Sequence, residues 1–206
     1  MTKAPEEGKI WEWRAFGRIS EGLAARIFAY PLRMGLSDVR GEDIYLVSPA
    51  SDQNVKLREF ATGWFLKFKL LLATKPGAVE LYRESARFTH RFPVGLEHVE
   101  EAARLLGVKL PELMGGPATF DEETLVQTLI KSSPPTIKIK VRKKRSQFQF
   151  DGGWLEMADV WFARNQVQSV SIHSTDIETV RGMLKRLDIG DGMEAMNYIE
   201  ACRRWG

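Results

Sequence analysis

The sequence predicts an α+β fold in which a large antiparallel β-sheet is covered by helices. Several segments alternate apolar and charged residues, which is the period of a strand with two different faces. Other segments repeat their apolar residues with the 3.6-residue period of a helix. The length of 206 residues and a hydrophobic content of 44% suit one domain that spans residues 1–206 and buries its own core.

In the first half of the chain, alternation predicts a series of strands. One helix interrupts the series, because Ser20 can cap residues Glu21–Tyr30 and Pro31 would end them. The turn Lys75-Pro76-Gly77 joins the last two strands. The predicted strands are Lys9–Gly17, Asp43–Val47, Asn54–Phe60, Trp64–Leu72 and Val79–Phe88.

In the middle of the chain the spacing becomes helical. Apolar residues share one helical face, and Gly107 is placed to end a helix over Val94–Gly107. Pro and Gly are frequent after this helix. We expect residues 110–135 to form a loop and a short helix at Glu122–Ile130. Two roles stay open for residues 108–135, that of a lid and that of a packing insert.

A basic ribbon is predicted over Thr136–Met157. Six of the eight residues in Lys138–Arg145 are Lys or Arg, and aliphatic residues alternate with the first of them. Asp151-Gly152 is typical of a tight hairpin turn, so a second strand should return through Glu156. Such a ribbon has one apolar and one cationic face.

The C-terminal part should add a strand and two helices. Alternation predicts the strand at Gln166–His173, and Thr175-Asp176-Ile177-Glu178 matches a capping box that opens a helix to Leu187. Asp191 would open the last helix. Its inward-facing residues would be Met193, Met196, Ile199 and Cys202.

Composition excludes several classes of protein. The net charge is only +3, so any strongly cationic surface must be local. Cys202 is the only cysteine, which excludes an internal disulfide and a zinc site built from several thiolates. No run approaches the roughly 18 apolar residues of a membrane span, so we expect a cytoplasmic protein without a membrane partner.

At least four predicted strands oppose an apolar face to a face of Lys, Arg and Glu. If the sheet curls into a barrel with helices outside, the charged face lines a cavity. A lining so rich in cations would repel itself unless it held a polyanion, and phosphate chains are the natural candidates. The alternative is an ordinary sheet whose charged face lies in water.

The charged motifs also follow one another in a recognisable order along nearly the whole chain. They are Glu12-Trp13-Arg14, Lys56-Leu57-Arg58, Lys67 or Lys69, Arg83-Glu84, and Lys143-Lys144-Arg145 followed by a hairpin and Glu156. This order resembles the CYTH superfamily, the triphosphate tunnel metalloenzymes, which include thiamine triphosphatases and class IV adenylyl cyclases. The resemblance implies an eight-stranded antiparallel β tunnel with helices packed outside.

The same resemblance implies a function and a set of site residues. A triphosphate-containing substrate, such as inorganic, nucleoside or thiamine triphosphate, would be bound and hydrolysed in the tunnel. Glu12, Glu84 and Glu156 would be the catalytic residues and would hold Mg²⁺ or Mn²⁺, which polarises the terminal phosphoryl group. The residues that would bind the phosphates are Arg14, Lys56, Arg58, Lys67, Lys69, Arg83, Lys143 and Arg145.

Two positions depart from the family pattern. Ile10 stands where the family has the first glutamate of its opening strand, and His173 stands where it tends to carry a later one. Histidine is a poor ligand for Mg²⁺. The alternative function is therefore a catalytically impaired module that binds polyphosphate, a nucleotide or an RNA 5′ end. A third hypothesis, without a tunnel, is a basic ribbon that binds RNA.

Overall fold

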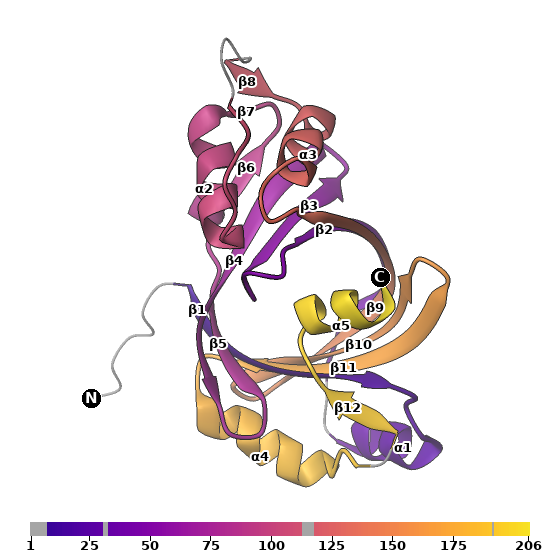
Figure 1. The fold of residues 1–206 in the computed structure, drawn as a ribbon. Helices are drawn as coiled ribbons and strands as arrows, with labels where there is room; N and C mark the ends of the chain where they lie inside the picture. The colour runs from indigo at the N-terminus through magenta and orange to yellow at the C-terminus, as the bar shows by residue number, and fades with distance from the viewer. Residues whose placement is uncertain (1–7, 31–32, 113–117, 191) are drawn as a thin grey trace, which may run out of the picture.

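The fold is seen in a computed structural model, which describes residues 8–30, 33–112, 118–190 and 192–206, and only the backbone of residues 34–38. The chain curls into a β-barrel with helices around it (Figure 1). Among these residues, no helix is long and apolar enough to span a membrane.

Eight antiparallel strands of the described chain close into the barrel, which confirms the predicted fold class. The ring runs β1–β11–β10–β9–β2–β3–β4–β5, and β1 closes it by pairing with both β11 and β5. The strands of the ring are β1 (Lys9–Gly17), β2 (Arg33–Val47), β3 (Asn54–Phe60), β4 (Gly63–Lys75), β5 (Val79–Arg83), β9 (Ile137–Phe150), β10 (Gly153–Phe162) and β11 (Asn165–Ser174).

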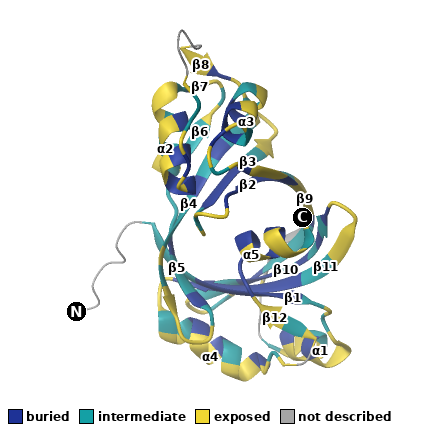
Figure 2. Ribbon diagram, viewed as in Figure 1, coloured by how far each residue is buried: buried dark blue, intermediate teal, exposed yellow. Residues whose placement is uncertain are grey.

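Helices cover two sides of the outer surface. On one side α2 (Leu96–Leu106) and α3 (Glu122–Ile130) bury the apolar outer face of β3 and β4. On the other side α1 (Glu21–Ala29) and α4 (Ile177–Leu187) bury the outer face of β1, β10 and β11, and the strands are dark where helices cover them (Figure 2). The short elements are β6 (Thr89–Arg91), β7 (Val94–Gly95), β8 (Thr119–Phe120), β12 (Met193–Ala195) and a 3₁₀ turn at Ala86–Phe88.

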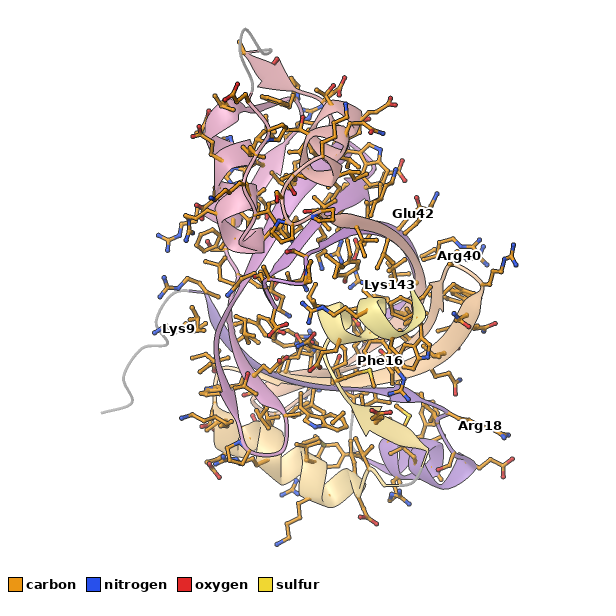
Figure 3. All side chains as sticks on the ribbon, viewed as in Figure 1. Lys9, Phe16, Arg18, Arg40, Glu42 and Lys143 are labelled. Atoms are coloured by element: carbon orange, nitrogen blue, oxygen red, sulfur yellow. The ribbon has the colours of Figure 1, made fainter. Side chains whose placement is uncertain are left out.

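The last helix, α5 (Tyr198–Trp205), packs against the inner face of the barrel at one end. Phe16 shares the inward face of β1 with Glu12 and Arg14, and its ring contacts Tyr198 edge-on at 5.2 Å. Figure 3 shows Phe16 and Lys143 beside this helix. The helix therefore fills that end of the barrel with apolar side chains, and the charged inward residues lie beyond it.

Over the first part of β9, the apolar face rather than the cationic face points into the barrel. Ile139 and Val141 are buried against α5, whereas Lys138, Lys140 and Arg142 are exposed on the outside of the barrel. The inward face becomes cationic only further along the strand. The cause is α5, because a strand segment that faces an apolar helix must turn its aliphatic side chains toward it.

Strand β2 is longer than predicted, since it begins at Arg33 rather than at Asp43. It pairs with β9 over its whole length, with register shifts between Met34 and Val39. Gly, Ser and Asp in this segment are poor strand formers, so long-range pairing overrides local propensity. Strand β5 is shorter than predicted, since it ends at Arg83 rather than at Phe88.

Two predicted helix starts are wrong. Asp176, rather than Thr175, caps α4, because its carboxylate accepts a hydrogen bond from the backbone N–H of Thr179 at 2.8 Å. The last helix begins at Tyr198 after a capping box of Asn197 and Glu200, and the residues before it form strand β12. The predicted start at Asp191 lies outside the described residues. Gly107 ends α2 as predicted, with φ of 66°.

Candidate functional site

Charged side chains that point into the barrel enclose a cavity of about 140 Å³. The closed barrel brings together every predicted site residue except Arg83. Because the inward cations lie inside a closed sheet, the hypothesis of an open basic ribbon is wrong. The lining includes the cations Arg14, Lys56, Arg58, Lys67, Lys69, Lys143 and Arg145 and the carboxylates Glu12, Glu84 and Glu156.

Arg83 lies at the end of β5, between two residues that do line the cavity. Tyr82 and Glu84 face inward, and side chains alternate along a strand, so Arg83 is on the other face. We therefore do not place Arg83 among the residues that could contact a phosphate in this cavity.

Asp43 is a site residue that the sequence analysis missed. Its carboxylate accepts hydrogen bonds from Nε and Nη2 of Arg58, at 2.7 and 2.8 Å, and from Nζ of Lys143 at 2.7 Å. Lys56 lies 3.7 Å away. Burial raises the pKa of Asp43, but these cations outweigh burial and hold it well below its usual value. Asp43 and Tyr45 are two residues apart in β2 and share its inward face, whereas Ile44 between them faces outward, and this alternation was the signal available in the sequence.

Two tyrosines lie next to Asp43, and one of them, Tyr198, lines the cavity. Nζ of Lys143 donates a hydrogen bond to the Tyr45 hydroxyl at 2.9 Å and lies 3.8 Å from the ring centroid of Tyr198. The guanidinium of Arg14 lies 4.6 Å from the same ring. Tyr198 belongs to α5, so the helix that fills one end of the barrel also holds two cations by cation–π contacts.

Two buried polar atoms of the lining have no hydrogen-bond partner among the described residues. They are the hydroxyl of Tyr198 and the side-chain oxygen of Asn54, and both residues are less than 8% exposed. A buried polar group without a partner costs about 1–3 kcal/mol. The cavity therefore offers unused hydrogen-bonding capacity as well as charge.

Glu12 lies at the centre of a second ion-pair cluster. Nε of Arg14 donates to its carboxylate at 2.9 Å, Nζ of Lys69 donates to the other oxygen, and Nδ1 of His173 lies 3.4 Å from it. Burial raises the pKa of Glu12, but Lys69, His173 and Arg14 together hold it well below its usual value. Lys69 also contacts Glu84 at 2.9 Å.

Glu156 contacts side chains of both β9 and β1 in the cavity. Arg145 contacts its carboxylate at 3.2 Å, Nε2 of Gln147 donates to it at 3.1 Å, and Nη1 of Arg14 lies 3.5 Å away. Burial raises the pKa of Glu156, but Arg14 and Arg145 outweigh it and lower the pKa to about 2. The carboxylate is therefore ionised at neutral pH and paired with Arg145 and Arg14.

The predicted metal ligands Glu12, Glu84 and Glu156 do not fit a shared metal ion in this arrangement. Each carboxylate is engaged by Lys or Arg side chains. Within the described ranges, no three His, Cys, Asp or Glu side chains are placed to hold a metal. The dependence on Mg²⁺ or Mn²⁺ stays a prediction from the sequence.

His173 is buried between Trp154, Ser171 and Glu12. Its ring stacks on Trp154 at 4.7 Å with an interplanar angle of 4°, and its Nε2 lies 2.8 Å from the Ser171 hydroxyl. Burial lowers the pKa of His173 to about 4, so the ring is neutral at pH 7. Ser171, His173 and Glu12 contact one another in the same order as the nucleophile, base and acid of some hydrolases. Ser171 is fully buried, however, and does not line the cavity. Ser171 therefore orients the ring.

Burial disfavours the charged form of several lysines in the cavity. Burial lowers the pKa of Lys143 to about 8, although Asp43 partly offsets it. Burial also lowers the pKa values of Lys56 and Lys67. An anion that enters the cavity would raise these pKa values, so its binding is coupled to proton uptake.

The barrel fold occurs in solved structures of low sequence identity. A conserved hypothetical protein from Pyrococcus furiosus is 18% identical, with a TM-score of 0.51 over 92% of this chain and 98% of that chain. A putative adenylyl cyclase from Hippeastrum, described as having a dominant triphosphatase activity, is 11% identical, with a TM-score of 0.51 over 95% of both chains. No family model matches the sequence, and no curated protein matches it. These likenesses show a shared fold.

Proposed function

We propose that the barrel binds the phosphate chain of a triphosphate-containing compound in its inner cavity and hydrolyses it. One observation carries the proposal: seven Lys and Arg side chains and three carboxylates line one cavity inside the closed barrel. Arg offers paired donors that match phosphate oxygens, and Lys offers a compact charge. The unpartnered Tyr198 hydroxyl adds a further donor.

The size of the cavity agrees with a phosphate chain. Its volume of about 140 Å³ is below the roughly 300–1,000 Å³ of pockets that enclose a drug-sized molecule. The cavity would therefore hold the phosphates and leave any organic group outside.

Hydrolysis requires stabilisation of the charge on the transferred phosphoryl group. The inward guanidinium groups of Arg14, Arg58 and Arg145 are already oriented by carboxylates, so they can stabilise this charge without reorganisation. The triphosphatase activity described for the Hippeastrum protein of the same fold supports this part of the proposal.

A second candidate function is binding of triphosphate or polyphosphate without turnover. The observation that favours it is that Glu12, Glu84 and Glu156, the three carboxylates of the described lining, are each paired with Lys or Arg side chains rather than grouped around a common metal position. Both functions share the cavity and differ in phosphate release.

The test is thermal unfolding with tripolyphosphate, alone and with Mg²⁺ or Mn²⁺, followed by an assay for released phosphate. A ligand present at 100 times its dissociation constant adds about 2.7 kcal/mol. Arg145→Gln should weaken binding at least tenfold, whereas Arg142→Gln, on the outer face of the same strand, should not. Stabilisation with phosphate release supports hydrolysis, and stabilisation alone supports the binding module. Equal effects of the two variants would contradict both functions.

A further inference from the structure

A second cavity adjoins the charged one at the β9–β10 hairpin, at the end of the barrel away from α5. Its volume is about 740 Å³. Gln147 and Trp154 line both cavities, so they form the boundary between them. A group attached to a phosphate chain in the inner cavity could therefore reach this space directly.

The chemistry of this second cavity differs from that of the first. Among the described residues, its lining has no charged side chain; it consists of the rings of Phe150 and Trp154, the amides of Gln147 and Gln149, and small residues of the turn. Aromatic rings stack on planar heterocycles, and Gln amides pair with their donor and acceptor edges. The volume is within the range of pockets for nucleoside-sized ligands.

The aromatic walls are held in place before any ligand arrives. Trp154 is stacked on His173, and Phe150 contacts the ring of Tyr30 edge-on at 6.4 Å. At Gly153, a Cβ atom would lie 2.9 Å from Cζ of Phe150 and 2.2 Å from the carbonyl oxygen of His173. The turn needs glycine there, because the Phe150 ring lies close to its backbone. A preorganised site of this kind loses little entropy on binding.

We propose that this cavity binds the organic part of the substrate, and that this part is an uncharged planar heterocycle such as a nucleobase. The inference rests on the proposed function, because the phosphate chain in the inner cavity positions the group attached to it. It narrows the substrate to a heteroaromatic triphosphate rather than inorganic triphosphate.

Another cavity next to the inner one suits an uncharged heterocycle less well. It has a volume of about 530 Å³, lies between β2 and β3, and shares Arg58, Lys143 and Arg145 with the inner cavity. Its other walls carry Glu42 and Glu59, with Arg40 beside them. A neutral ring there would remove these charges from water without pairing them. The aromatic residue of this cavity, Phe60, serves as a matched control.

Isothermal titration calorimetry of the full chain tests the proposal with two probes, tripolyphosphate and ATP. Phe150→Leu removes a stacking surface, and Gln149→Ala removes an exposed amide that the barrel does not need. Loss of a stacked base typically costs about 5- to 150-fold in affinity. We expect each variant to raise the dissociation constant of ATP about tenfold and to leave that of tripolyphosphate within about twofold. Phe60→Leu should change neither.

The outcomes separate this inference from the proposed function. If tripolyphosphate binds but neither variant weakens ATP, or if both probes weaken equally, the organic subsite is wrong and the phosphate site stands. If Phe60→Leu weakens ATP instead, the organic group lies between β2 and β3. If tripolyphosphate does not bind the wild-type chain, the proposed function fails and this inference fails with it. If Phe150→Leu does not fold, the effect of Gln149→Ala on the dissociation constant of ATP alone tests the organic subsite.

Discussion

Replacing Asp43 with Asn should destabilise the empty protein and increase the stabilisation by a phosphate chain. The Asp43 side chain is 3% exposed and pairs with Arg58 and Lys143 at 2.7 Å, with Lys56 at 3.7 Å. Removing one partner of a buried ion pair costs about 3–5 kcal/mol, because the remaining charge is left without compensation. For a chain of this length, each kcal/mol lowers the melting temperature by about 2–4 °C. The expected decrease is therefore roughly 6–20 °C.

A phosphate chain supplies the negative charge that the Asp43→Asn variant would lack. Tripolyphosphate should therefore bind the variant more tightly than the wild-type chain, and each tenfold gain adds about 1.4 kcal/mol at a fixed ligand concentration. The assay is thermal unfolding over a tripolyphosphate titration. Asp52→Asn is the control, because Asp52 pairs with Arg203 on the surface and its loss should cost less than about 1 kcal/mol. If Asp43→Asn were as stable as this control, or gained less from the ligand than wild type, Asp43 would not be offsetting the charge of Arg58, Lys143 and Lys56.

Four further predictions concern pH, reactivity and backbone strain. Burial lowers the pKa of Lys143 to about 8, so calorimetry should show tripolyphosphate affinity falling from pH 7 to 9; a flat profile would contradict this. Burial raises the pKa of Glu156, but its cationic neighbours lower it to about 2, below the unfolded value of about 4.3. Its contribution of about 3 kcal/mol is present above pH 4.3 and lost as the pH falls through 2, so urea unfolding of Glu156→Gln should lack this acid-dependent loss. Burial raises the pKa of Cys202 to about 12, so a thiol reagent should label it only in urea, and labelling of the native chain would overturn this. A Cβ at Gly17 would lie 1.8 Å from the carbonyl oxygen of Gly192, so Gly17→Ala should lower the free energy of unfolding by about 1–3 kcal/mol, measured in urea against wild type.

The charge balance of the inner cavity differs from the sequence prediction in one important respect. The sequence suggested an excess of cations that only a ligand could offset. In the fold, Asp43 and Glu12 each engage at least two of these cations, so carboxylates of the protein itself offset part of the positive charge. Burial still disfavours the charged forms of Lys56 and Lys143, whose pKa values are lowered.

Elements that depend on local pattern could be predicted from the sequence. The bounds of β1, β3 and α3 match the predictions, because alternation, helical spacing and caps act over a few residues. The same alternation placed Glu12 and Arg14 on one face of β1, and Lys67 and Lys69 on one face of β4.

The face of a strand that lines the barrel, and the partners of each charged side chain there, could not be predicted in this way, because they depend on contacts between distant segments. Alternation defines two faces for β9, but α5, far along the chain, turns Val141 inward and Arg142 outward. Asp43 becomes a site residue because the pairing of β2 with β9 brings its carboxylate within 2.7 Å of Nζ of Lys143, and Arg83 leaves the site because β5 turns it outward. The physical reason is that a strand has a fixed period but no fixed partner, so orientation and neighbours are set by long-range pairing and burial.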